Sequence, residues 1–217
     1  MRSFALSIAI VSLLGLAAPP NLHAQARTSK NTTLLGATSP FEDLTEAAME
    51  KDAAGIATAL RAVDAKAAAV RKALPAAAAG TYDGLLAAIH RAVEAGEHHA
   101  IAMSAVDAFR LLLDNLEPKG LVVPREVLLL DSVGFRLHVL EAAPEADWEA
   151  IGKSVAEGAA WWAATRPKVA RVALRDAMDT AIRGLQEGEK TKNLPLLHFA
   201  AQVDLDLVDL LEGYFER

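Results

Sequence analysis

The stretch IATALRAVDAKAAAVRKAL, residues 56–74, shows the pattern that decides the fold. Its spaced apolar residues recur at intervals of four and three, which places them on one face of a helix that turns about 100° per residue. These residues are Ile56, Leu60, Val63, Ala67, Val70 and Leu74. Pro75 follows directly and predicts the end of the helix, because proline cannot continue the backbone hydrogen bonding. The segment therefore predicts an amphipathic helix with one buried stripe.

The same period continues to the end of the chain, with breaks at prolines and glycines. Helices are predicted at 82–95, 97–116, 124–143, 146–165, 169–187 and 194–215, and no stretch alternates with the period of two that strands require. Hydrophobic residues make up 53% of the 217-residue chain but aromatic residues only 5%, because alanine is abundant. Alanine is the best helix former and buries little area. We therefore expect an all-α helical bundle with closely spaced helices.

A short internal similarity predicts how the helices are grouped. Ala88-Ile89 followed by Gly96-Glu97 resembles Ala181-Ile182 followed by Gly188-Glu189, and each pair precedes a helix with a similar spacing of histidine, aspartate and leucines. We interpret residues 41–116 and 146–217 as two related three-helix modules. A joining helix within 117–145 would then lie at the centre of the bundle.

The first 40 residues have a different character. Arg2, an apolar run over residues 4–18 and Pro19-Pro20 are typical of a secretory signal peptide over residues 1–24, with cleavage after Ala24 or Ala26. Residues 25–40 are rich in Thr, Ser, Asn and Gly and are interpreted as a flexible leader. The mature protein would have no membrane span and would be periplasmic or secreted.

Composition excludes several classes of function. The net charge is −6 with no basic patch, which argues against nucleic acid as a partner. The chain has no cysteine, so disulfides, c-type haem attachment, iron–sulfur clusters and thiol catalysis are excluded. It contains no nucleophile elbow, no phosphate-binding glycine loop and no His-Glu-x-x-His motif. A non-enzymatic role is favoured, although the sequence leaves a redox-active metal site open.

Three ionisable residues lie on a mainly apolar face of the predicted joining helix. Asp131 and His138 are seven residues apart, which is two helical turns along one stripe, and Glu141 follows His138 by three. Burying such groups is costly unless they are paired or bind a metal ion. Histidines and carboxylates at this spacing are how helical bundles build metal sites. The alternative is a structural network in which Asp131 orients His138.

The other histidines divide by helical face. His98 projects with Ile101, Ala105 and Phe109, so it is predicted to point inward and to supply a further ligand from a neighbouring helix. His90, His99 and His198 share faces with charged residues and are predicted to lie in solvent.

Residues 134–141, GFRLHVLE, resemble the His-x-x-Glu motif of the imelysin-like proteins, an exported helical family associated with iron uptake. That family carries the motif as Gly-x-His-x-x-Glu, and Arg136 stands here where the family has glycine. The resemblance implies that His138 and Glu141 are metal ligands.

These observations predict an exported helical protein that binds a metal ion through His98, Asp131, His138 and Glu141, with a role in iron or divalent-metal uptake. Mixed histidine and carboxylate ligands suit iron, zinc or manganese. One alternative is a scaffold or interaction module without a metal, in which Trp148, Trp161 and Trp162 are candidate anchors for a periplasmic protein partner. A further alternative is a haem-binding bundle with His98 and His138 as axial ligands.

Overall fold

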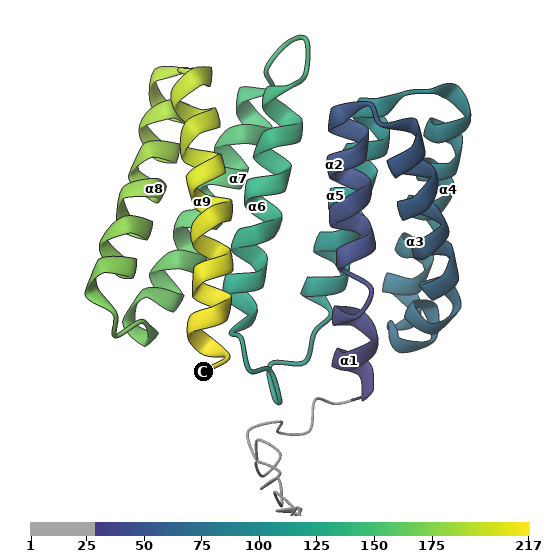
Figure 1. Ribbon diagram of the computed structural model, residues 1–217, viewed down its shortest axis with the longest axis horizontal. Helices are drawn as coiled ribbons and strands as arrows, with labels where there is room; N and C mark the ends of the chain where they lie inside the picture. Colours follow the sequence, from purple (N-terminus) through teal and green to yellow (C-terminus); the bar gives the residue numbers. More distant parts are fainter. Residues whose placement is uncertain (1–28) are drawn as a thin grey trace, which may run out of the picture.

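The computed structural model describes residues 29–217, and every regular element in that range is helical (Figure 1). The elements are α1 (Ser29–Leu35), α2 (Ser39–Glu50), α3 (Ala53–Ala73), α4 (Ala76–Ala95), α5 (His98–Asp114), α6 (Arg125–Glu141), α7 (Trp148–Thr165), a 3-10 turn η1 (Arg166–Lys168), α8 (Val172–Thr191) and α9 (Leu194–Phe215). The all-α fold class predicted from the sequence is confirmed. None of these helices is long and apolar enough to cross a lipid bilayer. The predicted signal peptide lies outside the described residues.

Local chemistry sets the ends of the helices. Asp52, Asp147 and Asn193 each cap the helix that follows, because their side-chain oxygens accept hydrogen bonds from backbone N–H groups of its first turn. Helix α3 ends at Ala73, and Leu74 before Pro75 is already extended, as the residue before a proline tends to be. Gly96 closes α4 in the left-handed conformation, at φ 68°, which glycine adopts without steric cost.

Helices α2 to α5 pack around a first apolar core (Figure 1). Phe41 of α2 and Tyr82 of α4 meet edge to face at its centre, with ring centroids 6.2 Å apart. Ile101 and Leu112 of α5 are also fully buried. Alanines fill much of the remaining contact surface, so the helices approach closely.

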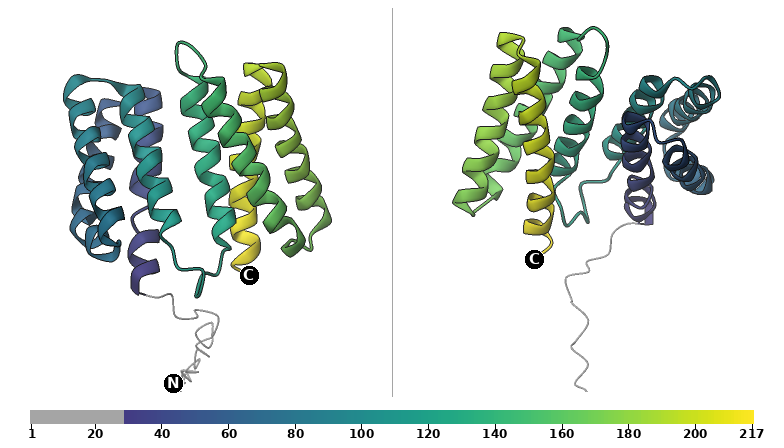
Figure 2. Two further views of the ribbon diagram at one scale, coloured as in Figure 1. Left: turned by 180° about the vertical axis from the view of Figure 1, so that it is seen from behind. Right: turned by 45° about the horizontal axis from the view of Figure 1, so that its top comes forward.

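Helices α6 to α9 pack around a second core that includes Leu130, Leu137, Ile151, Met178 and Leu197. Figure 2 shows from two further directions that α6 stands between α5 on one side and α7 and α9 on the other. Helix α6 is therefore central, and it also completes the second group of helices. It can do both because Leu129 and Val139 face the first core while Leu130 and Leu137 face the second. Among residues 29–217, the first group has four helices, α2 to α5, and not the three predicted for its module, and the internal repeat stays a prediction.

The segment predicted to be a flexible leader contains helix α1. Leu34 is fully buried in the first core, and so is Asn31. The Asn31 side chain donates to the backbone oxygen of Glu117 and accepts from its N–H, both at 2.8 Å. These long-range contacts order residues whose composition alone indicated a loop.

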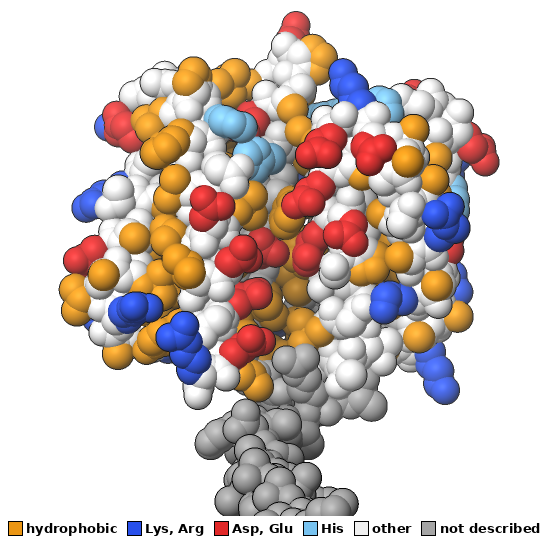
Figure 3. All heavy atoms as spheres, viewed as in Figure 1, with side chains coloured by type: hydrophobic (Ala, Val, Ile, Leu, Met, Phe, Trp, Pro, Cys, Tyr) orange, Lys and Arg blue, Asp and Glu red, His pale blue; other side chains and the backbone are white. Residues whose placement is uncertain are grey.

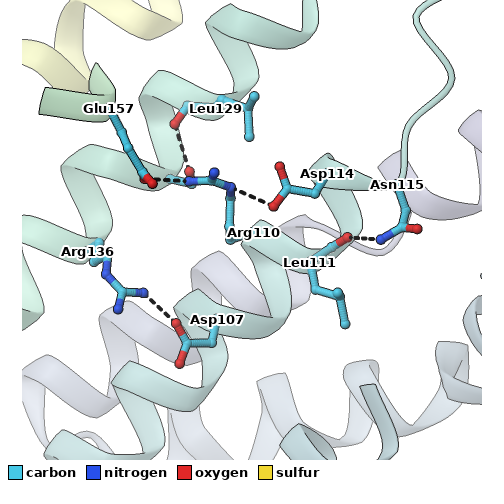
Figure 4. Close-up of polar contacts among 9 residues, drawn as sticks. Asp107, Arg110, Leu111, Asp114, Asn115, Leu129, Arg136 and Glu157 are labelled. Carbon is cyan, nitrogen blue, oxygen red and sulfur yellow. Dashed lines mark hydrogen bonds and ion pairs between the residues drawn. The ribbon is translucent and has the colours of Figure 1, made fainter. Parts of the chain in front are cut away.

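Ion pairs connect the two groups of helices (Figure 4). Arg136 of α6 binds Asp107 of α5 at 2.5 Å, and Arg110 of α5 binds Glu157 of α7 at 3.1 Å. The Arg110 guanidinium also lies 4.3 Å from the centre of the Trp161 ring. Because these side chains are partly exposed, each pair contributes little to stability, and they chiefly fix how the two groups are oriented.

Gly134 of α6 lies directly against the Leu205 side chain of α9. A Cβ atom at this position would lie 2.4 Å from Cδ2 and 2.6 Å from Cγ of Leu205, distances that real structures do not tolerate. The Leu205 side chain therefore occupies the space that any larger residue at position 134 would need. This contact fixes the separation of the two helices that carry the candidate site described below.

We expect Gly134→Ala to lower the free energy of unfolding by about 1–3 kcal/mol, because the added methyl group overpacks the α6–α9 contact. The matched control is Gly84→Ala in α4, where an added Cβ meets nothing within 4 Å. That change should raise stability by up to about 1 kcal/mol through helix propensity. Urea unfolding of both variants checks this, and equal effects of the two substitutions would contradict the packing argument.

Candidate metal centre

Two adjacent helices bring three metal-ligating side chains together. His138 and Glu141 are three residues apart on α6, so their side chains point to the same side of that helix. His198 lies near the beginning of α9, which packs along α6. Figure 3 shows histidine side chains near the upper end of α9, beside the hollow between the two groups of helices.

Glu141 is at the centre of this cluster. Its Oε1 atom lies 3.1 Å from Nδ1 of His138 and 2.5 Å from Nδ1 of His198. The two imidazole rings meet edge to face with their centroids 5.1 Å apart. The cluster is therefore a carboxylate held between two histidines.

Burial divides the cluster into an inner and an outer part. The Glu141 side chain is 7% exposed and that of His138 18%, whereas that of His198 is 64% exposed. Within residues 29–217, neither Oε2 of Glu141 nor Nε2 of His138 has a hydrogen-bond partner, although both atoms are buried. A buried carboxylate oxygen without a donor is energetically unfavourable, and a bound cation would relieve that cost.

The donor set fits a transition-metal ion. One ligand atom from each of the three residues lies within 4.8 Å of the others, and among residues 29–217 no other group of three His, Cys, Asp or Glu side chains meets this condition. A tetrahedral ion with bonds of about 2.1 Å needs ligand atoms about 3.4 Å apart, which small side-chain adjustments would provide. Binding would displace the protons that now join the imidazoles to Glu141.

Of the four residues predicted from the sequence, the structure brings His138 and Glu141 together. His98 begins α5 and is not among the clustered residues. Asp131 lies two turns before His138, in the lining of a separate cavity. His198 was assigned to the solvated face of its helix. The exposure of His198 agrees with that assignment. Its ring nevertheless contacts the carboxylate of Glu141, which lies on the adjacent helix α6.

Asp204 is a further functional candidate that the sequence analysis missed. It lies on the face of α9 that packs on α6, is fully buried, and neither carboxyl oxygen has a hydrogen-bond partner within residues 29–217. Burial raises the pKa of Asp204 to about 8. Its carboxyl is therefore protonated and neutral at pH 7.

Comparisons with known proteins add no assignment: no family model, no curated protein and no solved structure matches this chain. The resemblance of residues 134–141 to the imelysin-like motif therefore stays a prediction.

The raised pKa of Asp204 gives stability a pH dependence. The folded protein keeps a proton that the unfolded chain, with an ordinary pKa of 3.8, releases. The free energy of unfolding should therefore fall as pH rises from 4 towards 8. We expect Asp204→Asn to reduce the fall between pH 5 and pH 8 by about 3–4 kcal/mol, since the amide cannot ionise and each pH unit in which only the folded state holds the proton changes stability by about 1.4 kcal/mol.

Urea unfolding at the two pH values measures this difference. The control is Asp206→Asn, which removes an exposed carboxylate from the same helix and should leave the fall unchanged. An Asp204→Asn protein with the wild-type pH dependence would show that folding does not raise the pKa of the Asp204 carboxyl.

Proposed function

We propose that this protein binds a divalent transition-metal ion between α6 and α9, with His138, Glu141 and His198 as ligands. The observation that carries the proposal is the buried Glu141 carboxylate, which contacts an imidazole on each side and has one oxygen without a partner. Nitrogen and oxygen ligands of this kind suit iron, zinc or manganese.

The position of the site supports a role in carrying an ion rather than in holding a structural one. Three protein ligands leave at least one coordination position open, and structural zinc sites are normally closed by four. His198 is mostly exposed, so an ion can reach the site without unfolding of the bundle. The signal-like N-terminal sequence and the imelysin-like motif support a periplasmic or secreted protein of metal uptake.

The proposal is tested with mature protein purified without a histidine tag. We expect one metal ion per chain. Elemental mass spectrometry would detect an ion that remains bound on purification, and titration would detect the uptake of added Fe²⁺, Zn²⁺ or Mn²⁺. His138→Ala, His198→Ala and Glu141→Gln should each weaken binding at least about 10-fold, because each removes a direct ligand. Thermal unfolding of the variants would confirm that they remain folded.

Two controls separate this ligand set from other histidines. His99→Ala changes an exposed histidine and should bind like wild type. His98→Ala should also keep its affinity, although the sequence alone predicted His98 as a ligand. A wild-type protein that takes up none of these ions would leave the cluster as a hydrogen-bonded structural network, and a visible absorption band of haem would favour the alternative haem-binding function.

A further inference from the structure

A second candidate site lies between the two groups of helices. A cavity of about 240 Å³ is enclosed by parts of α2, α5, α6 and α9 and by the loop before α6. We call it the acidic groove, after the five carboxylates in its lining: Glu42, Asp131, Asp209, Glu212 and Glu216. Figure 3 shows acidic side chains gathered along both sides of the hollow between α9 and α2.

The negative charge of this groove is not balanced within the described chain. Among residues 29–217, no lysine or arginine forms an ion pair with any of the five carboxylates. The Thr38 hydroxyl stabilises the charged form of the Glu42 carboxyl. Asp131 receives no such hydrogen bond and no ion pair from any residue in the range 29–217. Asp131 lies in the lining of the cavity with a partly exposed side chain, and among residues 29–217 no cation neutralises its carboxylate.

Burial and mutual repulsion raise the pKa values of these carboxyl groups. Burial, followed by repulsion from Glu212 and other acids, raises the pKa of Glu42 to about 7. Burial and the nearby Asp209 and Glu216 raise the pKa of Glu212 to about 7. Burial and repulsion from Glu42 and Glu212 raise that of Asp131 well above its ordinary value. A bound cation would oppose each of these effects.

The shape and lining of the groove select the kind of cation. Its carboxylates do not converge as the ligands of the metal centre do, because no three of them bring their oxygens within 4.8 Å of one another. Its remaining wall is apolar and includes Phe109, Leu113 and Leu128. Pockets for drug-sized ligands have volumes of about 300–1,000 Å³, so this cavity suits a smaller molecule.

We propose that the acidic groove binds a small aliphatic diamine or polyamine. One ammonium group lies against Asp131 and its neighbours Glu42 and Glu212, where its three N–H donors can reach separated carboxylate oxygens. The methylene chain lies along the apolar wall formed by Phe109 and Leu113. This site is separate from the metal centre, since Asp131 precedes His138 by seven residues, or about 10 Å along α6.

The test is calorimetric titration of the full mature chain with putrescine, cadaverine and spermidine at pH 7.5. We expect saturable binding of one amine per chain and release of protons from the carboxyls of the groove, measured in two buffers of different ionisation enthalpy. Asp131→Asn should weaken binding at least 10-fold. The control Glu94→Gln removes an exposed carboxylate on α4 and should bind like wild type.

The outcome also distinguishes this site from the metal centre. Asp131→Asn should bind metal normally, and His198→Ala should bind amines normally. The absence of saturable amine binding would overturn the proposal. Equal loss of affinity in Asp131→Asn and Glu94→Gln would also overturn it, because it would indicate non-specific attraction to a negative protein. Tight binding of Ca²⁺ or Mn²⁺ that depends on Asp131, without amine binding, would assign the groove to a metal ion instead.

Discussion

The contact between α6 and α9 determines which side chains of the candidate metal centre can meet. It rests on Gly134, whose missing side chain leaves room for Leu205. At this separation, the Glu141 carboxylate on α6 can reach His198 on α9. If the two helices were further apart, Glu141 would contact only His138 on its own helix, and no site between α6 and α9 would form. The packing at Gly134 thus helps to position the residues of the candidate metal centre.

Helix α6 has polar groups in unfavourable surroundings at two places. At its C-terminal end, Glu141 and His138 have buried polar atoms without partners, and two turns earlier Asp131 faces other carboxylates. Stability alone would favour apolar residues at these positions, because buried unpaired charge is costly. These groups are the basis of our two proposals, a transition-metal ion at the C-terminal end of α6 and an amine in the acidic groove.

The sequence predicted much of the fold because helical periodicity is a local property. The spacing of Ile56, Leu60 and Val63 was sufficient for α3, and Pro75 marked its end. Helix α1 was missed because Asn31 is ordered by contacts with Glu117, far away in the chain. His198 was missed as a site residue for a similar reason, since its partner is on another helix. Asp204 could have been found: Leu197, Ala201, Asp204, Val208 and Leu211 recur at intervals of four and three, which places the carboxyl on the buried stripe.

The most direct test of the central claim is anomalous diffraction from crystals of the mature protein grown with Fe²⁺, Zn²⁺ or Mn²⁺, measured at the absorption edge of the metal. We expect one strong peak between His138, Glu141 and His198, within about 2.0–2.2 Å of an imidazole nitrogen from each histidine and of a Glu141 oxygen. A peak elsewhere, for example beside Asp131, or an undisturbed hydrogen-bonded cluster in crystals that contain the metal, would contradict it.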